Sequence, residues 1–91
     1  MEKILTLHPQ GKKGVNISKA KYDQMMEFIL TSIKEKEVIT FSDLGDLAVE
    51  KLEGKFDGSI MWYFTSVKLD LEARGIIKRI PKTSPHQLTL A

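Results

Sequence analysis

The sequence predicts an α+β fold, mainly α, with three helices followed by a C-terminal β-hairpin. Three segments carry apolar residues at helical spacing, and each follows a residue that can cap a helix. Two short segments near the C-terminus are rich in isoleucine or alternate apolar and polar residues, as strands do. The chain has 91 residues and therefore room for one small domain around a single core.

Residues 1–17 predict a short strand followed by an extended arm. Ile4, Leu5 and Leu7 form a brief apolar stretch, and the proline and two glycines that follow interrupt it. We therefore divide the chain into an N-terminal strand and arm, residues 1–17, and a folded domain, residues 18–91.

The first helix is predicted to start after Ser18 and to run to about Lys36. Ser18 is a good N-cap, and Ile17 before it can pack on Tyr22 as a hydrophobic staple. One face of this helix carries the apolar residues Tyr22, Met25, Met26, Ile29 and Ile33.

The second helix follows residues 37–41, a β-branched segment predicted as a short strand or extended link. Thr40 and Ser42 are both available as its N-cap, and Asp43 lies three residues after Thr40, where a carboxylate favours a helix start. Apolar residues at helical spacing continue the helix to about Glu53, where a glycine-rich turn ends it.

The third helix is predicted to run from its N-cap Ser59 to Gly75, a residue suited to a helix C-terminus. Residues 76–80 and 87–90 then form two strands around the polar loop 81–86. Three amphipathic faces and a hairpin must cover one another, which predicts one shared core. Its expected members are Tyr22, Met26, Ile29, Ile33, Leu44, Leu47, Ile60, Phe64, Val67, Leu71, Ile77 and Leu88.

This order of elements resembles the winged helix-turn-helix family. Residues 38–44 are similar to its short strand that runs into the second helix, and residues 67–77 to the end of its recognition helix. The most specific match is Leu-Glu, two residues, Gly75 and two isoleucines, where the glycine turns the chain from helix into strand. The resemblance covers residues 18–90 and extends to small stand-alone bacterial families without assigned function. It implies a third helix placed in the major groove of DNA and a hairpin that serves as the wing.

The charge distribution permits nucleic-acid binding. The formal net charge is +2, with basic residues at both ends of the chain and an acidic middle. The third helix nevertheless offers few donors to base edges, and Asp70 and Glu72 on it are expected to repel phosphate. Our first interpretation is therefore a nucleic-acid-binding winged helix similar to transcriptional regulators, whose contacts to double-stranded DNA are expected mostly at phosphates. The candidate residues are Lys12, Lys13, Ser59, Thr65, Ser66, Lys68, Lys78, Lys82, Thr83 and His86.

The side of the third helix opposite its core face is unusually apolar. Trp62 and Leu69 lie there one helical repeat apart, close to Ala73. Either the arm, through Ile4, Leu5 and Leu7, covers them, or the same surface of a second chain does so in a homodimer. Both alternatives predict that Trp62 is more than half buried in the biological unit, and this surface gives a second candidate function, protein interaction without DNA binding.

No motif predicts catalysis, so we expect no enzyme, no cofactor and no metal. The chain has no cysteine, and its two histidines stand in separate loops without neighbouring acids. The acids of the second helix are expected to form a solvated face. The N-terminus has no secretory pattern and the longest apolar run is too short to cross a membrane, which predicts a cytoplasmic location without a membrane partner.

Overall fold

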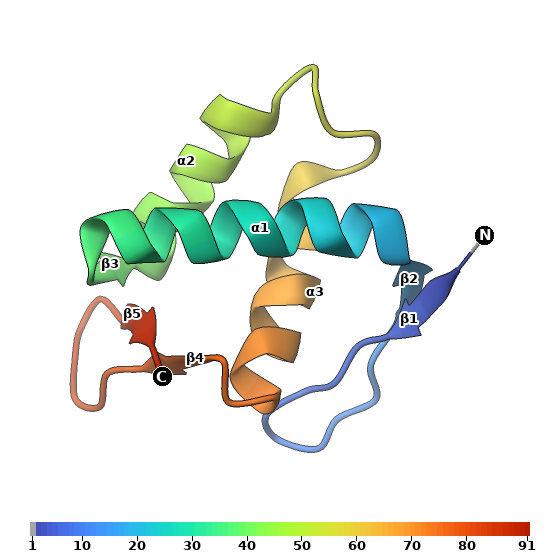
Figure 1. Cartoon of the computed structure of the whole chain (residues 1–91). Coiled ribbons are helices and arrows are strands. Elements are labelled where there is room, and N and C mark those ends of the chain that lie inside the picture. The colour runs from blue at the N-terminus through green and yellow to red at the C-terminus, as the bar shows by residue number, and fades with distance from the viewer. Residues whose placement is uncertain (1) are drawn as a thin grey trace.

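The computed structural model describes residues 2–91 and has the predicted α+β architecture (Figure 1). In the described residues, three helices are accompanied by five short strands. These elements are β1 (Lys3–Leu5), β2 (Asn16–Ser18), α1 (Lys19–Lys36), β3 (Ile39–Thr40), α2 (Phe41–Leu52), α3 (Ile60–Ala73), β4 (Ile77–Arg79) and β5 (Gln87–Leu90).

The three helices begin at the capping residues expected from the sequence. The Ser18 hydroxyl accepts from the Lys21 amide, and the Ser59 hydroxyl accepts from the Trp62 amide at 3.3 Å. Of the two caps available to α2, the structure uses Thr40, whose Oγ1 accepts from the Asp43 amide at 3.0 Å. Local sequence therefore sets where each helix starts.

The C-terminal hairpin forms a three-stranded antiparallel sheet with β3. The strand order is β3-β5-β4, so the last strand of the chain lies between the other two. Leu88 of β5 faces Ile39 on one side and Arg79 on the other. A further bond from the Phe41 amide to the His86 carbonyl, at 3.0 Å, ties the start of α2 to the hairpin.

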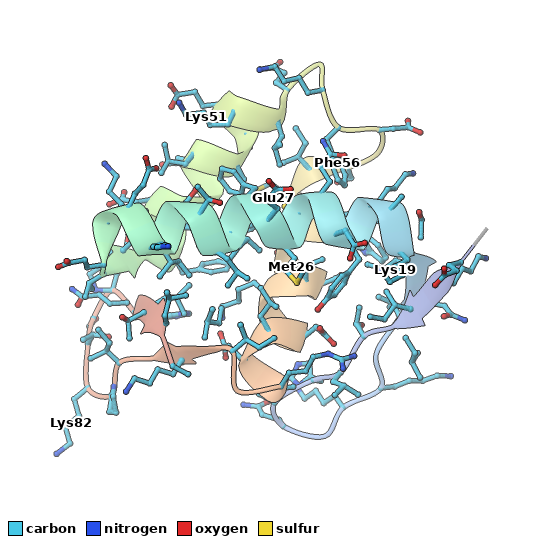
Figure 2. The ribbon with its side chains drawn as sticks, in the orientation of Figure 1. Lys19, Met26, Glu27, Lys51, Phe56 and Lys82 are labelled. Carbon is cyan, nitrogen blue, oxygen red and sulfur yellow. The ribbon has the colours of Figure 1, made fainter. Side chains whose placement is uncertain are left out.

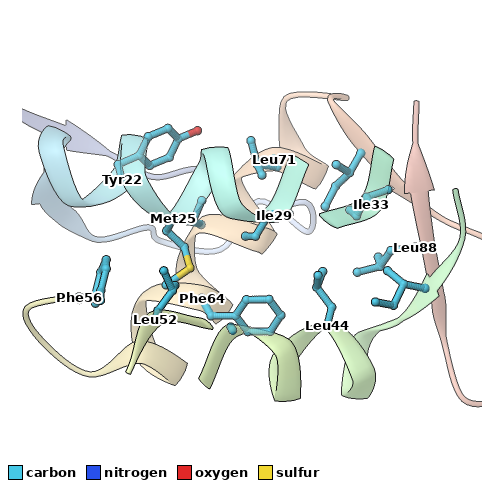
Figure 3. Close-up of a cluster of buried hydrophobic side chains, with 14 of the residues drawn as sticks. Tyr22, Met25, Ile29, Ile33, Leu44, Leu52, Phe56, Phe64, Leu71 and Leu88 are labelled. Carbon is cyan, nitrogen blue, oxygen red and sulfur yellow. The ribbon is translucent and has the colours of Figure 1, made fainter. Parts of the chain in front are cut away.

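The core lies between α1, α2 and α3 and extends to the sheet (Figure 3). Nine of the twelve predicted core residues are buried, whereas Met26, Leu47 and Ile60 only pack on its edge. The choice of Met26 was wrong, because Met25 occupies the centre and is fully buried. Five further buried residues were not predicted: Ile17, Ile39, Ala48, Leu52 and Phe56.

The N-terminal segment differs from the predicted strand and free arm. β1 pairs antiparallel with β2, a strand that the sequence did not predict, and Ile4 lies opposite Ile17. The residues between them, 6–15, form a loop that we call the arm loop. In Figure 1 the arm loop reaches the end of α3, on the side away from the β4–β5 hairpin.

Candidate functional site

The candidate site is the outward face of α3, defined by Trp62, Thr65, Ser66, Leu69 and Ala73. Trp62 and Thr65 are exposed, and the other three side chains are half-buried. The opposite side of the helix carries the fully buried Phe64, Val67 and Leu71. This division agrees with the helical spacing in the sequence.

Trp62 is the largest exposed group on this face. Its side chain is 47% exposed and packs edge-on against the neighbouring Tyr63, with 4.9 Å between ring centroids. The arm does not cover Trp62, although this was one of the two alternatives that the sequence suggested. The arm loop instead meets α3 at Ala73, about 16 Å further along the helix axis. Leu5 and Leu7 of the arm themselves stay 58% and 45% exposed.

Lys68 is not available as a phosphate ligand, contrary to expectation. It is only 5% exposed and forms an ion pair with Glu72 one turn later. Its Nζ also lies 3.4 Å from His86 Nε2 and 4.9 Å from the centroid of the Phe41 ring. Lys68 therefore fastens the hairpin to α2 and α3 through a cation–π contact and charge-assisted contacts.

Two hairpin candidates also serve the fold. His86 stacks on Phe41, with 5.3 Å between ring centroids. Burial, together with the positive charges of Lys68 and Arg79, lowers the pKa of His86 below its usual 6.5. Thr83 Oγ1 donates to the Ile80 carbonyl at 2.8 Å and accepts from the Gln87 amide at 3.0 Å. Both side chains thus shape the loop, residues 80–86, which we call the hairpin loop.

Asp70 is a buried residue whose structural role the sequence interpretation missed. It is fully buried, whereas we expected an exposed acid that repels phosphate. Its Oδ1 accepts from the Leu7 amide at 2.8 Å, and its Oδ2 accepts from the Tyr22 hydroxyl and from Arg74 Nε, the latter at 2.8 Å. One carboxylate therefore joins the arm loop, α1 and α3. Burial and the bond to Asp70 raise the pKa of Tyr22, and the bond to Asp70 raises the pKa of Arg74.

The arm loop is closed by a pair of bonds at its base. The Thr6 amide donates to the Val15 carbonyl at 2.8 Å, and the Val15 amide donates to Thr6 Oγ1 at 2.9 Å. A side chain at Gly14 is excluded, because its Cβ would lie 1.7 Å from the Thr6 carbonyl oxygen. The glycine thus permits the close backbone approach that closes the arm loop at its base.

A cleft of about 440 Å³ lies between the arm loop and the end of α3. Leu5, Leu7 and Ala73 contribute apolar lining, and Lys12 and Lys13 stand at the cleft with their side chains exposed. On the other side of α3, Lys78 and Lys82 of the hairpin are also exposed, and Lys82 projects from the hairpin loop in Figure 2. Among residues 2–91, these four lysines take part in no ion pair.

Acidic side chains line a second cleft, between α1 and α2. The cleft between the end of α1 and α2, about 490 Å³, is lined by Asp43, Asp46 and Glu50, but in the described part of the chain no three His, Asp or Glu side chains are grouped to hold a metal ion. None of the helices in residues 2–91 is long and apolar enough to cross a membrane.

The structure thus defines a small α+β domain with an apolar outward face on α3. A family model described as a family of unknown function, DUF6958, matches residues 3–88, and the chain belongs to this family. No curated protein and no solved structure matches the chain.

Proposed function

We propose that this chain is a winged-helix module that binds protein through the outward face of α3. The observation that carries the proposal is the exposed Trp62 on an apolar face that has no free cation on its own helix. Tryptophan is enriched at the centres of protein interfaces. An exposed apolar patch on a small domain is also typical of an interaction surface.

The winged-helix assignment is supported by the order of the elements. Three helices precede the β4–β5 hairpin, and β3 at the start of α2 pairs with the last strand in the order β3-β5-β4. One feature differs from a simple helix-turn-helix, in which three or four residues join the two helices. Here residues 53–59 join α2 to α3, and Phe56 from this connection is buried against Tyr63.

The same face is poorly equipped to read bases. Arg, Lys, Asn and Gln make most specific contacts to base edges, and none of them is on the outward face. Of its polar residues, Thr65 and Ser66 provide single hydroxyls, while the Ser59 hydroxyl before it caps the helix. Lys68 is held by Glu72 and the hairpin.

Site-specific photo-crosslinking tests this proposal. A benzophenone amino acid replaces Thr65 on the outward face, and a matched control replaces Glu50, an exposed residue of α2. After irradiation of cells that express each variant, position 65 is expected to give adducts that nuclease leaves intact and that position 50 does not give. Adducts at position 65 that nuclease removes would contradict protein binding.

Duplex DNA is the second candidate ligand, because exposed lysines stand on both sides of α3. Lys12 and Lys13 on the arm loop and Lys78 and Lys82 on the hairpin could contact phosphates. Such binding would weaken steeply with salt and vary little with sequence.

Anisotropy of labelled duplexes at two salt concentrations tests this candidate. Replacing Lys78 and Lys82 with Ala should weaken binding to every duplex alike and reduce the salt slope by about 2, since each lysine neutralises one phosphate. The matched control removes Lys34 and Lys51, two exposed lysines on other helices, and should change the slope little. Binding that is sequence-selective and insensitive to salt would contradict this mode, as would the absence of binding at low salt.

A further inference from the structure

We propose that the protein bound by the outward face of α3 is a second copy of this chain, paired about a two-fold axis. In this dimer Trp62 of each copy enters the cleft between the arm loop and α3 of the other. The inference rests on the proposed function, because it names the partner of the same face. It also goes further, since each cleft is filled only when the partner copy supplies its Trp62.

The Trp62 side chain and the cleft belong to one continuous surface. Ala73 lies on the same side of α3 as Trp62 and Leu69, and it also lines the cleft with Leu5 and Leu7. The apolar surface therefore leads from Trp62, near the start of α3, to the cleft at its end, about 16 Å along the axis. If two such helices lie antiparallel across a two-fold axis, each Trp62 meets the partner's cleft and both contacts form together.

The two ends of this surface differ in charge, and the exposed acids lie at only one of them. The cleft end has Lys12 and Lys13 with exposed side chains. The Trp62 end adjoins the connection before α3, where Glu53 and Asp57 are exposed. Lys55 between them is exposed as well, and Asp57 forms an ion pair with Lys21 at 3.7 Å. An antiparallel pair brings the acids of one copy towards the lysines of the other, whereas a parallel pair would bring like charges together. Complementary charges of this kind favour one orientation over another.

The single tryptophan makes the contact directly observable. Trp62 is the only one in the chain, so its emission reports on this face alone. With rising protein concentration we expect a blue shift of the emission and a fall in acrylamide quenching, together with a monomer-to-dimer transition in sedimentation. Trp62→Ala should raise the dissociation constant of the dimer by about a thousandfold, because the two-fold dimer then loses two tryptophan hot spots, each with an effect of about thirtyfold.

A mixing experiment tests the exchange of Trp62 between copies. The Trp62→Ala variant retains the cleft but lacks the tryptophan that fills it. The Leu7→Ser variant retains Trp62 but has a less apolar cleft, and its backbone amide at position 7 can still donate to Asp70. Neither variant alone can form an intact contact, whereas a mixed dimer restores one of the two. Adding the Trp62→Ala protein, which has no tryptophan, should therefore shift the emission of the Leu7→Ser protein to the blue.

A cysteine variant tests, independently of Trp62, whether the outward faces of two copies meet near the proposed axis. Ser66 lies on the outward face between Trp62 and Ala73, close to the proposed axis, and the chain has no native cysteine. Ser66→Cys should form an interchain disulfide on mild oxidation, and Lys51→Cys on α2 should not.

The inference is overturned if the chain stays monomeric at the highest attainable concentration. It is also overturned if a dimer forms that is unaffected by Trp62→Ala and shows no rescue in the mixture. In either case nuclease-resistant adducts at position 65 would still support protein binding by α3. Adducts at position 65 that nuclease removes would instead contradict the proposed function itself.

Discussion

The arm side and the hairpin side of α3 are held by two buried charges of opposite sign, Asp70 and Lys68. Asp70 is fully buried and accepts bonds from three elements, one of them the backbone of the arm loop. Lys68 pairs with Glu72 on its own helix and reaches the hairpin loop through His86. The arm is thus fixed by hydrogen bonds to a carboxylate, and the hairpin loop by aromatic and charge contacts that include a titratable ring.

The outward face of α3 carries no charged side chain. The two charges of the middle of the helix, Lys68 and Asp70, are both buried, and the outward positions hold Trp62, Leu69 and Ala73 together with two hydroxyl residues. Asp70 and Lys68 instead stabilise the positions of the arm loop and the hairpin loop. The arm loop carries the exposed Lys12 and Lys13, and the hairpin carries the exposed Lys78 and Lys82.

Asp70→Ala should have the largest effect, because it leaves the Tyr22 hydroxyl, the Leu7 amide and the Arg74 guanidinium without their shared acceptor. Removing one partner of a buried ionic cluster costs about 3–5 kcal/mol. Urea unfolding should show this loss, and hydrogen exchange should show faster exchange of the Leu7 amide. Asp46→Ala, at an exposed acid of α2, should change the free energy of unfolding by less than about 0.5 kcal/mol. Equal losses for the two variants would refute the structural role of Asp70.

Lys68→Met should have a smaller effect on the hairpin side. It retains the packing of the aliphatic chain but leaves Glu72 unpaired, which costs about 1–3 kcal/mol for a partly buried group. Replacing Glu72 with Leu in the same chain should recover much of this stability, because the uncompensated charge is then absent. A double variant as unstable as the sum of both single variants would show that Lys68 and Glu72 are not coupled.

His86 should make the hairpin side sensitive to pH. Its pKa is lowered in the folded chain, so the unfolded chain binds the proton first as the pH falls. The contribution of neutral His86 is therefore complete above about pH 6.5 and is lost progressively below that value. His86→Gln should flatten the fall in stability between pH 7 and pH 5, relative to the unaltered protein, in urea titrations. Parallel pH profiles would show that His86 does not couple the hairpin to pH.

The sequence was sufficient for the helices and the hairpin but not for the buried charges. Helix starts depend on local signals such as Ser18 and Ser59, whose caps act within three residues. Asp70 is satisfied by partners 63 and 48 residues away, Leu7 and Tyr22, which no local pattern reveals. The ion pair between Asp70 and Arg74 could have been predicted, because side chains four residues apart on a helix are neighbours.

The strand and core residues that the sequence did not predict were missed for the same reason, since they depend on contacts between separate segments of the chain. Asn16–Ser18 is too short to show a strand pattern, and β2 forms because β1 pairs with it across the arm loop. Phe56 follows a glycine turn and is buried because the connection folds back onto Tyr63. The outward position of Trp62, in contrast, followed from helical spacing alone.

Trp62 emission during a titration with duplex DNA at low salt tests the central claim most directly, since it reports which class of partner covers the outward face of α3. If this face binds protein, the emission should stay unchanged as DNA is added at a fixed protein concentration. A quench or shift of Trp62 emission that saturates together with the anisotropy of the labelled duplex would contradict the claim, because it would place DNA on the face assigned to a protein partner.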